Sequence, residues 1–169
     1  MSLPRRIYEA SHLEGEFVLR SGTVATEYFD KYRFEGDPLL LADLLPPLAA
    51  LLPPDAEVLA GLELGGVPLA TALSLHTGLP LCFVRKKAKE YGTKRLAEGA
   101  DIAGKRVVVI EDVVTTGGQI ALSTADLRDR GAVVDTVLVV IDRETGGGAA
   151  LADIGLELRA LYTMADLGA

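Results

Sequence analysis

The feature that most constrains the fold is a short segment in the second half of the chain, residues 106–119, which reads RVVVIEDVVTTGGQ. Positions 107–110 are β-branched and apolar, a run typical of a strand buried on both faces in the middle of a parallel sheet. Two carboxylates, Glu111 and Asp112, follow at the point where we expect the strand to leave the core. A turn of small and hydroxyl residues precedes a helical pattern. The segment therefore predicts a strand–turn–helix unit of an α/β protein.

The turn itself has the composition of an anion site. Thr115, Thr116, Gly117 and Gly118 lie ahead of the expected helix, where small residues let several backbone N–H groups point at one anion. The adjacent acids would repel that anion unless they hold sugar hydroxyls or a divalent metal. A site that binds a phosphate, the two hydroxyls of a ribose and Mg²⁺ indicates a phosphoribosyl group as its ligand. The alternative is an ordinary strand–helix junction with an Asp or Thr cap, but a cap needs only one side chain.

Hydrophobic periodicity along the chain alternates between strands and helices. We expect helices at residues 3–12, 38–45, 68–77, 118–130 and 149–153, and strands at residues 16–20, 27–34, 57–62, 80–84, 106–110, 133–141 and 156–162. Pro46 and Pro47 should break or kink the second helix. This order implies parallel βαβ units. The expected loops at the carboxyl ends of the strands are residues 61–67, 85–100, 111–118 and 142–148, and they should converge on one crevice.

Composition and charge exclude several classes of protein. The net charge of −7 argues against a general nucleic-acid binder, which normally presents a basic face. No apolar run reaches the roughly 18 residues needed to span a bilayer, so we expect no membrane association. Cys82 is the one cysteine of the chain, which excludes an internal disulfide and favours a reducing, cytoplasmic compartment.

The positive charges are unevenly distributed along the chain. One short segment carries Arg85, Lys86, Lys87, Lys89, Lys94 and Arg95. On an acidic protein such a segment favours a local site for a small polyanion, and a solvated loop is the alternative.

Residues 107–118 resemble the phosphoribosyl-pyrophosphate (PRPP) signature of the type I phosphoribosyltransferases, which combines an apolar strand, two acids and a Thr/Gly turn. The resemblance implies an α/β fold with a doubly wound, mainly parallel sheet flanked by helices. It also implies that residues 1–169 form a single domain, in which residues 1–36 contribute a small hood over the base site.

Four further segments resemble the orotate phosphoribosyltransferase family, and their order and spacing carry this resemblance. They are residues 15–22 with Tyr28 and Phe29, similar to the family's hood; residues 65–70, similar to its pyrophosphate loop; residues 85–92, similar to its mobile catalytic loop; and residues 142–147, similar to its base-contacting segment. The resemblance implies transfer of the phosphoribosyl group from PRPP to orotate. The products are orotidine 5′-phosphate and pyrophosphate, in de novo pyrimidine (UMP) biosynthesis.

The same resemblance implies a site with Mg²⁺ as cofactor. PRPP is expected to contact Arg85, Lys86, Lys89, Tyr91, Glu111, Asp112, Val113, Val114, Thr115, Thr116, Gly117 and Gly118. Orotate is expected to contact Arg20, Tyr28, Phe29, Thr115 and Arg143. Lys89, Glu111 and Asp112 are the expected catalytic residues, and PRPP itself should hold most of the Mg²⁺ coordination, with help from the two acids. A homodimer is implied in which residues 85–99 are shared across subunits.

The sequence departs from the family at three positions, and two alternative functions stay open. Tyr91 stands where His is frequent, Arg20 where Lys is frequent, and Ala25 where Ser is frequent in the hood. The alternatives are a type I transferase for another purine or pyrimidine base, and a PRPP-binding regulator without catalysis. Arg143 favours a carboxylated acceptor, and the acidic net charge disfavours a regulator that binds nucleic acid.

Overall fold

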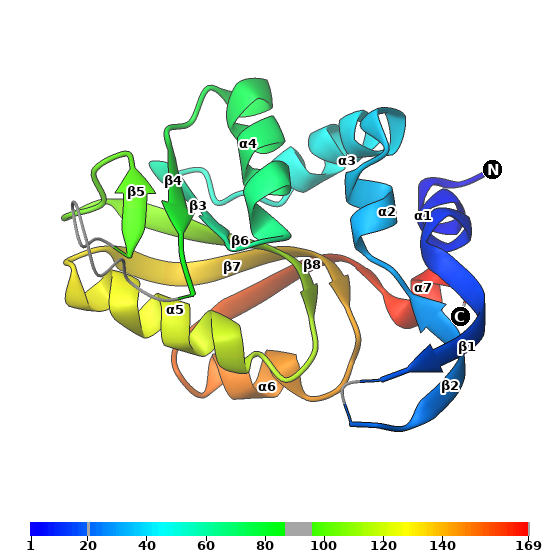
Figure 1. Ribbon diagram of the computed structural model, residues 1–169. Coiled ribbons are helices and arrows are strands. Elements are labelled where there is room, and N and C mark those ends of the chain that lie inside the picture. Colours follow the sequence, from blue (N-terminus) through cyan, green and yellow to red (C-terminus); the bar gives the residue numbers. More distant parts are fainter. Residues whose placement is uncertain (20, 87–95, 169) are drawn as a thin grey trace.

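A six-stranded sheet with the order β5-β4-β3-β6-β7-β8 forms the centre of the computed structural model, which describes residues 1–19, 21–86 and 96–168 (Figure 1). Its strands are β3 (Val58–Leu62), β4 (Leu81–Val84), β5 (Ala97–Gly99), β6 (Arg106–Val114), β7 (Val133–Asp142) and β8 (Glu157–Thr163). Neighbouring strands are parallel except β4 and β5, which are antiparallel. The predicted α/β fold with a mainly parallel sheet is confirmed.

The order of the strands creates a crevice between β3 and β6. Helix α4 (Gly66–Thr77) leads from β3 to β4, towards one edge of the sheet. Helices α5 (Gly118–Asp129) and α6 (Gly147–Ala152) lead from β6 through β7 to β8, towards the other edge. Ligands of open α/β sheets bind at the carboxyl ends of strands where the winding reverses in this way.

Two layers of apolar side chains cover the sheet, one on each face. Successive residues of a strand point to opposite faces, and β6 follows this rule: Val107 and Val109 join one cluster, whereas Val108 and Ile110 join the other. The first cluster packs under α5 and α6, and the second packs under α4 with α1 (Leu3–Ser11) and α3 (Pro38–Ala50). Figure 1 shows α3 and α4 above the sheet and α5 and α6 below it.

The first 36 residues, which we call the hood, lie at one end of the central sheet (Figure 1), and their Ile7 and Phe34 side chains join the second cluster. After α1, strands β1 (His12–Val18) and β2 (Val24–Phe29) pair with each other in antiparallel orientation. A short helix, α2 (Tyr32–Glu35), follows β2, and α7 (Met164–Leu167) ends the described chain. Among the described residues, no helix combines the length and apolar character that crossing a bilayer requires.

Several boundaries differ from those expected. Residues 27–34 do not form one strand, because the chain turns after β2 and α2 directs Phe34 into the core, where it is fully buried. Helix α3 runs through Pro46 and Pro47 to Ala50 instead of breaking, since Leu44 and its neighbours one turn away are buried along one face. Strand β5 lies inside the predicted loop of residues 85–100, and α7 was not expected.

Leu44 is fully buried in α3, whereas Leu39 on the same helix is 71% exposed. Leu44→Ala should therefore lower the free energy of unfolding by about 2–5 kcal/mol, because it removes buried methyl groups and leaves a cavity. Leu39→Ala is the matched control and should change it by no more than about 0.5 kcal/mol. Urea unfolding followed by circular dichroism measures both, and equal losses would contradict the packing described here.

Candidate active site

The two acids of the central segment lie inside the sheet, near the carboxyl end of β6. The strand continues past them to Val114, which is paired with Asp142 of β7. Glu111 is only 9% exposed and Asp112 is fully buried. The expectation that the strand leaves the core at the acids is therefore wrong, because the ladder with the longer strand β7 extends β6 beyond them.

The turn after β6 forms a small cavity at the N-terminus of α5, which we call the cradle. Its volume is about 190 Å³, and its lining consists of Glu111, Val113, Val114, Thr115, Thr116, Gly117, Gly118, Gln119 and Ile120. Gly117 has a φ of 76°, a left-handed conformation that glycine adopts without strain, and it immediately precedes the helix. Backbone N–H groups at a helix N-terminus favour phosphate, so the cradle has the chemistry of a phosphate site.

A larger cavity adjoins the cradle, between the hood and the ends of β6 and β7. It has a volume of about 440 Å³ and is lined by Leu19, Glu27, Tyr28, Phe29, Asp30, Lys31, Tyr32, Val113, Thr115 and Arg143. Val113 and Thr115 line both cavities. We call this second cavity the acceptor cavity. Four residues predicted for the base, Tyr28, Phe29, Thr115 and Arg143, come together here, and Arg20 lies outside the described residues.

The turn between β3 and α4 lies directly against the acids. A Cβ atom added to Gly65 would overlap the Asp112 carboxylate, and one added to Gly66 would overlap the carbonyl oxygen of Ile110. Only glycine permits so close an approach of one backbone to another. The predicted pyrophosphate loop, residues 65–70, therefore starts at the crevice between β3 and β6.

A cluster of buried charge holds Asp112 in place. The Nζ atom of Lys31, a hood residue, lies 2.6 Å from Asp112 Oδ2, and the backbone N–H of Val113 donates to Asp112 Oδ1 at 2.6 Å. Glu35, on α2 of the hood, is only 8% exposed and interacts with the same carboxylate. The backbone N–H of Asp112 donates to Glu111 Oε1 at 3.0 Å. Carboxyls from the hood and from β6 thus meet around one ammonium group.

The pKa values of the cluster reflect this arrangement. Burial, together with the neighbouring Asp112, raises the pKa of Glu35 to about 9 and that of Glu111 to about 8. Burial alone would raise the pKa of Asp112 as well, but hydrogen bonding to Glu35 and Lys31 outweighs it and lowers that pKa. Burial likewise opposes the charge of Lys31, yet its interaction with Asp112 raises the Lys31 pKa. At neutral pH the cluster therefore holds an ionised Asp112 beside protonated Glu35 and Glu111.

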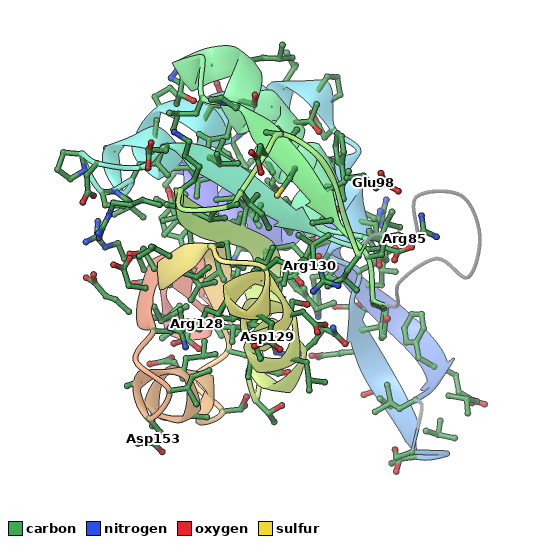
Figure 2. The ribbon with its side chains drawn as sticks, turned by 90° about the vertical axis from the view of Figure 1, so that its left-hand side faces the viewer. Arg85, Glu98, Arg128, Asp129, Arg130 and Asp153 are labelled. Atoms are coloured by element: carbon green, nitrogen blue, oxygen red, sulfur yellow. The ribbon has the colours of Figure 1, made fainter. Side chains whose placement is uncertain are left out.

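The basic segment begins at the edge of the crevice, after β4. Arg85 donates its backbone N–H to the Leu96 carbonyl at 2.9 Å, and the backbone N–H of Lys86 donates to Glu63 Oε2 at 3.0 Å. Figure 2 shows Arg85 on the side of the molecule opposite Asp153, which directly follows α6. Lys89 and Tyr91, which were predicted to contact PRPP, lie outside the described residues.

Sequence reasoning missed Lys31 and Glu35. They lie four residues apart, a spacing that brings side chains to one face of a helix. Because residues 27–34 were expected to form a strand, this signal was not recognised. Glu63 was missed as well, since its contact with Lys86 joins two separate loops.

Glu35→Gln tests the pKa of the buried cluster. The pKa of Glu35 is about 9 in the folded protein, against 4.5 for the ordinary group, so the folded state binds this proton more tightly than the unfolded state does. The resulting contribution to stability is fully present below pH 4.5 and is lost as the pH rises through 9. The wild-type free energy of unfolding should thus fall between these limits, by at most about 1.4 kcal/mol per pH unit for one proton. In Glu35→Gln this side chain is neutral at every pH, so the free energy of unfolding should fall less steeply with pH. Urea titrations at pH 6 and pH 9 measure it, and identical slopes would contradict the protonated state.

A sequence model of the phosphoribosyl transferase domain matches residues 52–153 of the chain. A curated relative from Nocardioides sp., named orotate phosphoribosyltransferase, is 57% identical over 157 residues, which cover 93% of this chain and 88% of the relative. The match extends over nearly the whole chain and therefore far beyond the signature segment.

Solved structures of similar proteins agree with this relationship. The orotate phosphoribosyltransferase of Mycobacterium tuberculosis, in complex with Fe(III) dicitrate, superimposes with a TM-score of 0.86 at 35% identity, covering 99% of this chain and 97% of that one. The same enzyme in complex with PRPP superimposes with a TM-score of 0.80 at 32% identity, with the same coverage of 99% and 97%. The chain therefore belongs to the phosphoribosyltransferases of type I and, within them, to the orotate phosphoribosyltransferase family of pentosyltransferase enzymes.

Proposed function

We propose that the protein transfers the phosphoribosyl group from PRPP to orotate, with release of pyrophosphate, in pyrimidine biosynthesis. One observation carries this proposal: the cradle and the acceptor cavity adjoin and share Val113 and Thr115. A donor whose 5′-phosphate lies in the first would present its sugar at the boundary with the second. Two reactants held side by side in this way react far faster than in free solution.

In this proposal the cradle binds the 5′-phosphate of the donor through the backbone and hydroxyl groups of residues 115–118. Glu111 lines the cradle and accepts hydrogen bonds from the ribose hydroxyls. Asp112, the next residue along β6, is the second candidate for these hydroxyls, although its carboxylate is fully buried and paired with Lys31 in this structure. Negative charge beside the sugar ring also stabilises the positive charge that develops as the bond to pyrophosphate breaks.

We propose Mg²⁺ as the cofactor, held mainly by oxygens of PRPP. Glu111 fits this role because its carboxyl group lines the cradle, where a nearby cation would favour the ionised form, and oxygen ligands suit Mg²⁺. Among the described residues, no group of three or more metal-binding side chains could enclose an ion. When bound, Mg²⁺ neutralises charge on the leaving pyrophosphate and orients it.

The acceptor cavity suits a flat anionic base. Tyr28 and Phe29 provide aromatic surface, and the Arg143 guanidinium can form a two-pronged contact with a carboxylate. Orotate enters as an anion, so the reaction requires no general base. Arg85 and Lys86, at the edge of the crevice, would meet the pyrophosphate together with Lys89 and Tyr91, which are assigned from the family resemblance alone.

The remaining assignments are proposals as well. We propose that residues 1–169 act as one domain, with the hood covering the base site. We also propose a homodimer in which residues 85–99 reach the neighbouring site, so that Lys89 acts there. The buried free thiol of Cys82 supports a reducing, cytoplasmic location.

A panel of free bases tests the proposed activity. The protein is incubated with PRPP, Mg²⁺ and one of orotate, uracil, adenine or xanthine, and consumption of the base is followed. We expect turnover of orotate alone. Turnover of adenine or xanthine with orotate untouched would contradict the acceptor but keep the donor site.

Arg143→Met tests the acceptor cavity. It should raise the KM for orotate about 10- to 100-fold, because a hydrogen bond to a charged group is lost, and leave the KM for PRPP within about twofold. Arg130→Met is the matched control, since Arg130 is exposed, does not line this cavity and donates a hydrogen bond to the Asp126 carbonyl. An unchanged KM for orotate in the first variant would remove Arg143 from the site.

A further inference from the structure

Lys31 stands between the two cavities, and no signature segment of the family assigned it a role. Its side chain lines the acceptor cavity, while its Nζ atom lies 2.6 Å from Asp112 Oδ2 at the floor of the crevice. It lies two residues after the end of β2 and immediately before the first residue of α2, so the hood backbone determines its position. Lys31 is thus a described residue that contacts both the acceptor cavity and the acids of β6.

The ammonium group of Lys31 has more N–H donors than its contact with Asp112 requires. The Asp112 carboxylate is fully buried, and its Oδ1 atom is already occupied by the Val113 N–H. An ammonium carries three N–H donors, and its ion pair with Asp112 Oδ2 occupies at most one of them. The Lys31 side chain is 35% exposed, so it remains accessible from the acceptor cavity.

The charges around Lys31 determine what it can bind. Asp112 on β6 is ionised, Glu111 and Glu35 hold their protons, and the Tyr32 ring lies 5.3 Å from Nζ. Glu27, Asp30 and Arg143 line the cavity itself. Asp112 keeps Lys31 charged, and its buried position fixes the ammonium at the cavity wall. A fixed cation beside a cavity of aromatic residues favours a planar base that carries a negative charge.

We propose that Lys31 is a specificity-determining residue, which binds the negative charge of the acceptor base while it stays paired with Asp112. The ligand class is a pyrimidine with an anionic substituent, and Lys31 acts beside Arg143 in selecting it. This inference rests on the proposed function. The inference also links the two cavities, because the ammonium group of Lys31 that would bind the base is also paired with Asp112.

Two nucleotides provide the sharpest test, because they differ only in the charged substituent. Orotidine 5′-phosphate carries a carboxylate on its base, and uridine 5′-phosphate lacks it. Both place a phosphate in the cradle and a base in the acceptor cavity, so the ratio of their dissociation constants isolates the recognition of that charge. Calorimetry on the wild-type protein should give clearly tighter binding of orotidine 5′-phosphate. If the wild type shows no preference, the proposed acceptor is wrong, whatever Lys31 does.

Lys31→Gln removes the charge but keeps an N–H donor for Asp112. It should weaken binding of orotidine 5′-phosphate about 10- to 100-fold and change that of uridine 5′-phosphate by less than about threefold. Lys31→Arg keeps the charge and should restore most of the preference. Lys105→Gln is the matched control: Lys105 pairs with Glu57 at 3.0 Å, before β6 and away from both cavities, and its loss should leave the ratio unchanged.

A purely structural role gives a different result. If Lys31 only compensates the buried charge, Lys31→Gln will lower the melting temperature and weaken both nucleotides equally, and the proposal is overturned. If Lys31→Gln keeps the wild-type ratio of the two dissociation constants, the proposal is overturned as well. Should that variant fail to fold, the double variant Lys31→Met with Asp112→Asn removes both charges, and the same ratio is measured on it. Loss of the preference there supports the proposal, and its retention refutes it.

Discussion

A carboxylate buried in the middle of a parallel sheet is the constraint on which the site depends. Asp112 is fully buried on β6, where an unpaired charge would cost several kcal/mol. Two parts of the fold lie against this carboxylate, and one of them, Lys31, compensates its charge. Lys31 reaches it from the hood, and the turn at Gly65 lies against it because no Cβ intervenes. The hood, β6 and the turn after β3 are therefore held together around one side chain.

This arrangement explains why the two cavities lie where they do. Ile7 and Phe34 anchor the hood in the apolar core, and the contact of Lys31 and Glu35 with Asp112 ties it to the carboxyl end of β6. The acceptor cavity is the space that results. The cradle needs no hood, since it consists of β6, the following turn and the first residues of α5. Donor binding thus uses local structure, whereas acceptor recognition requires two distant parts of the chain.

The sequence predicted the local features well and the distant contacts poorly. The buried run before Glu111 and the glycines after it identify β6 and the cradle, because strand, turn and helix propensities agree there. Packing overrode local signals elsewhere: α3 continues through Pro46 and Pro47, and α2 replaces the expected end of a strand. Lys31 could not be assigned, because its partner Asp112 is far away in sequence and nothing local indicates the pair.

A crystal structure of the protein with PRPP and Mg²⁺ tests the central claim most directly. The account predicts the 5′-phosphate within hydrogen-bonding distance of the backbone N–H groups of residues 115–118, and the ribose hydroxyls next to Glu111. The sugar's reacting carbon should face the cavity lined by Tyr28 and Arg143. Donor density elsewhere, with the cradle empty, would contradict the assignment of the donor site and the mechanism built on it.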